Sequence, residues 1–87
     1  MASYELVFRK SVARDLRVFP KQDVKRIVQR ILALADDPRP SGCEKLSSQD
    51  RYRIRQDVYR IIYEIEDSRL VVLIVKVGHR REVYRSR

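Results

Sequence analysis

The amino-acid sequence predicts an α+β domain in which two helices cover one face of a small sheet. Three observations support this prediction: an alternating stretch opens the chain, helical periodicity follows it, and the period falls to two in the C-terminal half. Helices and strands that are kept apart along the chain are typical of α+β folds. With 87 residues, we expect a single domain that spans residues 1–87.

The N-terminal half is predicted to form one strand and two helices. Residues 4–9 alternate between apolar and polar side chains, as does a strand with one covered face. Ser11 is a favourable N-cap, and apolar residues follow it at helical spacing as far as Phe19, so we expect a short helix to begin there. Pro20 ends that helix and suits the first turn of a second one, whose wide apolar stripe stops before residues 36–42.

Three strands are predicted in the C-terminal half, at residues 51–56, 59–65 and 70–77. The first two alternate, whereas the third is nearly all apolar, which is typical of a strand covered on much of both faces. The connections between them are short enough for hairpins, so the strands should form an antiparallel meander. Gly78 is expected to end the last strand.

The composition favours a polyanionic partner and a reducing compartment. The formal net charge is +8, and arginine, which binds phosphate and carboxylate groups through forked contacts, outnumbers lysine. The single cysteine, Cys43, excludes a disulfide within the chain and fits a cytoplasmic protein. No apolar run is long enough to cross a bilayer, so we expect no membrane partner.

Alternation places three arginines on one face of the predicted sheet. If the apolar residues of the strand at 51–56 face the helices, then Arg51, Arg53 and Arg55 face the opposite side. Arg60, on the next strand, could reach the same side. Like charges repel one another on a small sheet. Two interpretations remain open: the arginines are spread out and solvated, or they form a cationic groove that binds an anion.

The C-terminal residues add side chains that suit RNA. A meander places the end of its last strand beside the middle strands, so Arg80, Arg81 and Tyr84 could converge on the arginine face. A tyrosine ring beside arginines offers a surface on which a base can stack. His79, the only histidine, either is solvated, contacts phosphate or transfers protons. Three glutamates near these residues either pair with arginines or act in proton transfer: Glu64, Glu66 and Glu82.

Three short motifs follow one another along the chain: Lys45-Leu46 with Tyr52-Arg-Ile-Arg55, Tyr59-Arg60-Ile-Ile-Tyr63, and Val77-Gly78-His-Arg80 with Val83-Tyr84. Together with the opening strand and two helices, they resemble the RelE toxins of bacterial and archaeal toxin–antitoxin systems, within the wider RelE/ParE superfamily. The resemblance covers essentially the whole chain and implies a RelE-like fold.

The resemblance implies an endoribonuclease that cuts messenger RNA in the ribosomal A site. Its reaction would be the attack of a ribose 2′-OH on the neighbouring phosphate. By the same resemblance, Arg53, Arg55 and Arg60 hold the scissile phosphate and stabilise its charge. Arg80 lies near the leaving oxygen, and Tyr84 stacks on a base or takes part in proton transfer. Further RNA contacts are expected from residues that flank these: Arg51, His79 and Arg81.

The resemblance also implies partners. A cognate antitoxin would cover the basic face, and the ribosome would present messenger RNA in its A site. Operator DNA would be bound only through the antitoxin complex, and neither a cofactor nor a metal ion is expected. Two other functions stay open from the sequence: a ParE-type toxin that inhibits DNA gyrase, and a non-catalytic protein that binds RNA or the ribosome.

Overall fold

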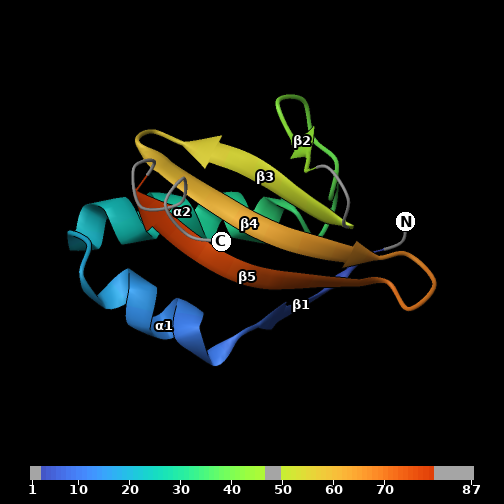
Figure 1. Ribbon diagram of the computed structural model, residues 1–87, viewed down its shortest axis with the longest axis horizontal. Coiled ribbons are helices and arrows are strands. Elements are labelled where there is room, and N and C mark those ends of the chain that lie inside the picture. Colours follow the sequence, from blue (N-terminus) through green and yellow to red (C-terminus); the bar gives the residue numbers. More distant parts are fainter. Residues whose placement is uncertain (1–2, 47–49, 80–87) are drawn as a thin grey trace.

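The computed structural model describes residues 3–46 and 50–79, which form two helices and a five-stranded sheet (Figure 1). In chain order the elements are β1 (Glu5–Phe8), α1 (Lys10–Arg17), α2 (Lys21–Ala33), β2 (Glu44–Lys45), β3 (Arg51–Gln56), β4 (Tyr59–Glu66) and β5 (Val71–His79). The predicted α+β class is confirmed. Neither helix of the described ranges is long and apolar enough to span a membrane.

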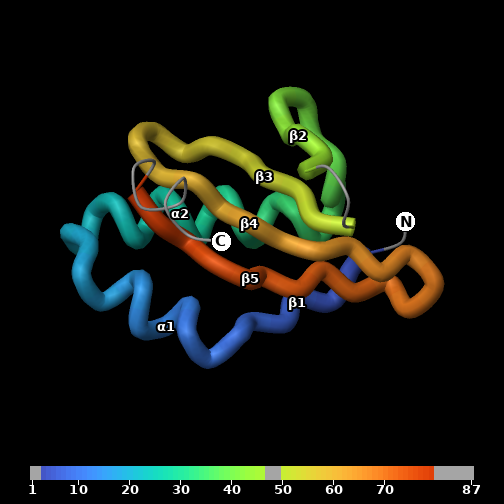
Figure 2. Tube along the Cα trace, viewed as in Figure 1, coloured from blue at the N-terminus to red at the C-terminus, as the bar shows by residue number. Residues whose placement is uncertain are grey.

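The C-terminal strands form the predicted meander, and the first strand joins them from the other side. β3 pairs antiparallel with β4, and β4 pairs antiparallel with β5. β1 lies parallel to β5, with Glu5 opposite Val71 and Phe8 opposite Ile74. The strand order is therefore β1-β5-β4-β3-β2, in which β5 lies between the first strand of the chain and β4 (Figure 2).

Both helices cover the same face of the sheet, because the apolar residues of the strands alternate toward that side. Val12 of α1 and Ile27 and Ile31 of α2 are buried in one cluster with Ile54 and Tyr63 of the sheet. Burying an aliphatic side chain contributes about 1.5–3 kcal/mol. This apolar layer therefore supplies most of the stability. Neither helix lies on the opposite face of the sheet, which we call the open face, although Arg60 and Ile62 on it are buried.

Two predicted boundaries are wrong, and tertiary pairing explains both. α1 begins at Lys10, so Ser11 lies inside the helix and is not its cap. Arg9 takes the N-cap position with an extended backbone, because its N–H donates to a carbonyl of β5 at 3.0 Å. β5 continues through Gly78 to His79, because β4 still offers pairing partners at both residues.

The two-residue strand β2 is absent from the sequence prediction. It pairs antiparallel with β3, which places Glu44 opposite Arg53 and Lys45 opposite Tyr52. Two residues carry no periodicity, so only their partner strand reveals that they are extended. β2 thereby brings a carboxylate alongside the arginine-bearing strand.

Candidate active site

The open face of the sheet carries the arginines that alternation predicts there. Arg51, Arg53 and Arg55 alternate along β3 with residues that pack into or against the apolar cluster. Arg60 of β4 lies directly opposite Arg55, one pair beyond the turn at residues 57–58. In a two-residue hairpin this pair is of the non-hydrogen-bonded type, whose Cα atoms approach to about 4.5 Å. The structure thus brings Arg55 and Arg60 together.

Arg60 is buried, which is unusual for an arginine. Only 6% of its surface is exposed, and arginine is almost never buried unless it is paired. On the β5 side, Arg60 lies opposite Gly78, which has no side chain to compete for the space above the sheet. A guanidinium fixed by its surroundings needs little rearrangement to stabilise an anion, which favours electrostatic catalysis.

Glu44 of β2 is a carboxylate whose pKa is lowered by three of these arginines. Its Oε1 atom accepts hydrogen bonds from Arg53 Nε at 3.2 Å and from Arg53 Nη2 at 2.7 Å. The hydrogen bond from Arg53 is the main reason why the pKa of Glu44 lies below its ordinary value, and the positive charges of Arg55 and Arg60 lower it further. We call these four residues the arginine cluster: Glu44, Arg53, Arg55 and Arg60.

Glu44 was not among the expected site residues. The sequence predicts neither a helix nor a strand between residues 42 and 51, so this carboxylate had no predicted neighbour. The only signal would have been the pairing of residues 44–45 with β3, which sequence periodicity cannot show for so short a strand.

Arg51 lies beyond Arg53 at the end of β3 that is remote from Arg55 and Arg60. It is four residues from Arg55, or about 13 Å along an extended strand. Its Nε atom donates to Glu64 Oε2 at 2.8 Å, from the opposite position on β4. Glu64 is therefore a partner of an arginine, which is one of the two roles that the sequence left open, and Glu66 likewise lies 3.6 Å from Arg69.

His79 lies on the helix-covered side of the sheet, not beside Arg60. It is opposite Tyr59, and the centroids of the two rings are 6.2 Å apart. Tyr59 packs on Phe19 in the apolar layer, and its hydroxyl donates to Asp23 at 2.7 Å. That hydrogen bond, with burial, raises the pKa of Tyr59 to about 12, so this phenol is neutral at physiological pH.

Asp15 of α1 anchors β5 just before Gly78. β1 ends at Phe8, so within residues 3–46 and 50–79 no strand lies beside the outer edge of β5 there. The N–H of Val77 instead donates to Asp15 Oδ2 at 3.2 Å, and Lys76 Nζ lies 4.0 Å from Asp15 Oδ1. The periodicity that predicts the helix gives no sign of this contact, which depends on how α1 docks on β5.

The C-terminal part of the predicted site lies outside the described residues: Arg80, Arg81, Glu82 and Tyr84. Its convergence with the arginine cluster therefore stays a prediction. Within residues 3–46 and 50–79, no group of three or more His, Cys, Asp or Glu side chains is placed to hold a metal ion. What the described residues offer is a set of neighbouring cations, one of them buried, beside the ionised carboxylate of Glu44.

Comparison with known proteins identifies the family. A family model described as ParE toxin of type II toxin–antitoxin system, parDE, matches residues 6–84 of the 87. The chain belongs to the RelE/ParE superfamily of toxins. Toxin RelG of Mycobacterium tuberculosis is 27% identical to this toxin over 84 residues, which cover 94% of this chain and 97% of RelG.

Solved structures place the toxin on the RelE side of the superfamily. The archaeal RelE–RelB complex from Pyrococcus horikoshii matches with a TM-score of 0.82 and 28% identity, covering 90% of this chain and 96% of that one. A free Escherichia coli RelE with two arginines replaced by alanine matches with a TM-score of 0.77 and 25% identity, covering 95% and 92%. This chain is thus a RelE-type toxin of a type II toxin–antitoxin system, as its motifs predict.

Proposed function

We propose that this toxin is an endoribonuclease that cuts messenger RNA in the A site of the ribosome. The observation that carries the proposal is the arginine cluster, in which Arg55 and Arg60 face each other beside the ionised Glu44. Two guanidinium groups on neighbouring strands, one of them buried, suit a phosphate whose negative charge grows in the transition state. The likeness to RelE toxins supports the same reaction class by analogy.

In the proposed reaction, the ribose 2′-oxygen bonds to the neighbouring phosphorus while the bond from phosphorus to the 5′-oxygen breaks. Glu44, held by Arg53, accepts the proton of the 2′-OH. Arg55 and Arg60 stabilise the charge on the phosphate oxygens and transfer no proton, because a guanidinium with a pKa of about 12.5 or more is a poor acid. The products are a 2′,3′-cyclic phosphate and a 5′-hydroxyl end.

The C-terminal residues complete the proposed site. Arg80 stabilises the leaving 5′-oxygen, and Tyr84 stacks on the adjacent base or supplies the proton that this oxygen takes up. Arg81 and Arg51 contact the message further out, whereas His79, which was expected to contact RNA, lies on the helix-covered side of the sheet and has no role in this scheme. The Arg51 contact is peripheral in this scheme, because Arg51 is held by Glu64 at the far end of β3.

The ribosome and an antitoxin are the proposed partners. The ribosome orients the 2′-OH against the phosphate, and such orientation can supply several kcal/mol of the barrier reduction. RelE relatives are solved in complexes with RelB, and a chain with a net charge of +8 suits an acidic antitoxin that covers its arginine cluster. In this proposal the complex acts in the cytoplasm and contacts operator DNA through the antitoxin.

Translation of a defined message in a cell-free extract tests the proposal. Arg55→Ala and Arg60→Ala should each lower cleavage by about 100-fold, as does the loss of one donor that stabilises a transition-state charge. Lys21→Ala is the matched control, because it removes an exposed cation from α2, on the opposite side of the sheet. Full cleavage by both arginine variants would contradict the site.

A separate variant tests the base. Glu44→Gln keeps the size of the side chain and loses its negative charge, so it should cut poorly. The same variant should bind the message more tightly, because a competing anion has been removed from the arginine cluster. Cleavage at the wild-type rate would mean that Glu44 is only a counter-ion.

Action on DNA gyrase is the second candidate function, because the matching family model carries the ParE name. Inhibition of supercoiling with an intact message would support it. Ribosome binding with neither effect would indicate a non-catalytic RNA-binding protein. Cleavage of the message in the A site, with normal supercoiling, would exclude both.

A further inference from the structure

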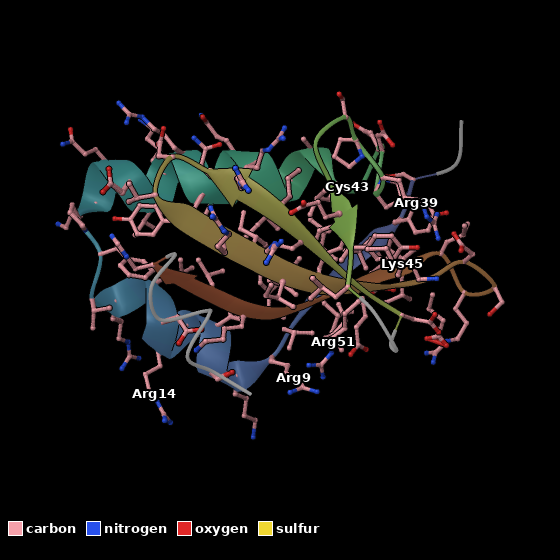
Figure 3. All side chains as sticks on the ribbon, turned by 45° about the horizontal axis from the view of Figure 1, so that its top comes forward. Arg9, Arg14, Arg39, Cys43, Lys45 and Arg51 are labelled. Atoms are coloured by element: carbon pink, nitrogen blue, oxygen red, sulfur yellow. The ribbon has the colours of Figure 1, made fainter. Side chains whose placement is uncertain are left out.

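A pocket lies at the edge of β3, next to the arginine cluster. It has a volume of about 430 Å³ and is lined by residues of α2, β3 and the segment that leads into β2: Arg30, Gly42, Cys43, Glu44, Ile54 and Arg55. Figure 3 shows Cys43 in the connection between α2 and β2. Glu44 and Arg55 belong both to the pocket and to the arginine cluster, so the two sites are continuous.

Arg30 gives this pocket a hydrogen-bond donor that is not in use. Its Nε atom is buried, and no acceptor within the described residues pairs with it. Buried N–H groups almost always have a partner. One turn earlier on α2, by contrast, the side chain of Arg26 is 60% exposed and lies 3.8 Å from Asp57. An acceptor on a bound molecule would satisfy Arg30.

The backbone of β3 is also open at this point. β2 begins at Glu44, opposite Arg53, so it does not reach Arg55. Pairing alternates along an antiparallel strand, and the N–H of Arg55 points away from β4, toward the side that β2 leaves open. Arg30 and Arg55 thus line the pocket, the N–H of Arg55 points toward its side of β3, and Glu44, the carboxylate among the described lining residues, is already held by Arg53.

We propose that this pocket binds a phosphate of the message next to the phosphate that is cut. The inference rests on the proposed ribonuclease function and deepens it by adding a second substrate subsite. An RNA strand whose scissile phosphate lies between Arg55 and Arg60 would pass over Glu44 and Arg55, which border both sites, into the pocket. A carboxylate of the antitoxin could use the same donors, but continuity with the arginine cluster favours a polymer that repeats its phosphates.

The thiol of Cys43 reports on the pocket without any need for cleavage. It is the only cysteine of the chain, so the rate of thiol alkylation reports on the accessibility of this pocket alone. An RNA trinucleotide with 2′-O-methyl groups cannot be cut and should slow the alkylation severalfold. The same trinucleotide with one uncharged methylphosphonate linkage should protect less. Protection by the antitoxin and none by the trinucleotide would overturn the assignment to RNA.

Arg30→Ala should raise the Kd of the trinucleotide about tenfold, the loss expected for one hydrogen bond to a charged group. It should also lower the slope of log Kd against log salt by about 0.7, the value for one phosphate contact on a single strand. Arg26→Ala is the matched control, because it removes the same charge from an exposed position of the same helix. Equal effects of the two variants would overturn the inference.

A conservative variant covers the case in which Arg30→Ala does not fold. Arg30→Lys keeps the positive charge and lacks the Nε donor, so it should bind with an intermediate Kd while melting near the wild-type temperature. Binding equal to wild type would overturn the role given to the Nε donor.

Failure of the proposed function would give a different result. If translated messages stay intact while the trinucleotide still protects Cys43 and Arg30→Ala weakens its binding, the pocket is an RNA site on a protein that is not a nuclease. If messages are cut and the Arg30 variants bind and cut like wild type, the subsite is wrong and the proposed function stands.

Discussion

Asp15 is predicted to stabilise the end of β5 that leads into the C-terminal part of the site. Its carboxylate accepts the N–H of Val77 at 3.2 Å and lies 4.0 Å from Lys76 Nζ. Asp15→Ala removes both contacts and leaves the N–H of Val77 at a strand edge with no protein acceptor. The end of β5 should then open more often, and the whole domain should unfold more easily.

The expected cost follows from these contacts. A hydrogen bond to a charged group contributes about 1.5–3 kcal/mol. The ion pair adds at most about 1 kcal/mol, because its side chains are 20% and 35% exposed and water screens them. Since water can replace part of the lost hydrogen bond, we expect Asp15→Ala to lower the free energy of unfolding by about 2 kcal/mol. For a domain of this size, Tm should then fall by about 8–16 °C.

Urea unfolding and amide hydrogen exchange measure this effect. The Val77 amide should exchange faster in Asp15→Ala than in wild type, by more than the change in global stability requires. Asp15→Asn keeps an acceptor oxygen and should cost about half as much. Asp36→Ala serves as the control, because Asp36 is exposed just after α2. Unchanged protection of the Val77 amide in Asp15→Ala would refute the reasoning.

Three further predictions concern stability. Tyr63→Phe removes the hydrogen bond from the buried hydroxyl to the Pro38 carbonyl, which is 2.8 Å long, and should cost about 1–3 kcal/mol in urea unfolding; a smaller cost would mean that water satisfies this carbonyl. The guanidinium of Arg39 holds the pKa of Asp67 below its ordinary value, so the stability from this pair is present above about pH 4 and is lost as the pH falls through the lowered pKa. Asp67→Asn should flatten this acid dependence, and an unchanged acid profile would contradict the pairing. The pKa of Tyr59 is raised to about 12. The stability that its hydroxyl contributes is therefore fully present below about pH 10 and is lost as the pH rises toward 12. Phenolate absorbance of Tyr59 that rises fully by pH 10 would show that the hydrogen bond to Asp23 does not hold the hydroxyl.

The parts of the fold that depend on side-chain periodicity or on short connections could be predicted from the sequence. Period-two alternation correctly placed Arg51, Arg53 and Arg55 on the open face, because it depends only on the geometry of a strand. The meander followed from the short connections between its strands. For Arg60 the sequence indicated only that it could reach the same side, and the structure adds that the turn at 57–58 places it directly opposite Arg55.

The features that were missed depend on pairing between distant segments. Ser11 has a favourable local preference for a helix cap, but β1 and β5 hold the chain extended through Arg9. Glu44 and Arg30 meet the arginine-bearing strand only after β2 and α2 have docked on it. Neither residue belongs to a motif with fixed spacing, so an argument from spacing alone could not find them.

Because β5 lies between β1 and β4, the sheet cannot be completed until the end of the chain has been synthesised. A chain that has been translated only as far as β4 has no strand to bridge β4 and β1, and two rows of backbone groups stay unpaired. Its apolar layer also lacks the residues of the most apolar strand. We therefore expect a chain that stops before Val71 to be unfolded and degraded by proteases, and not to act as a weakened toxin.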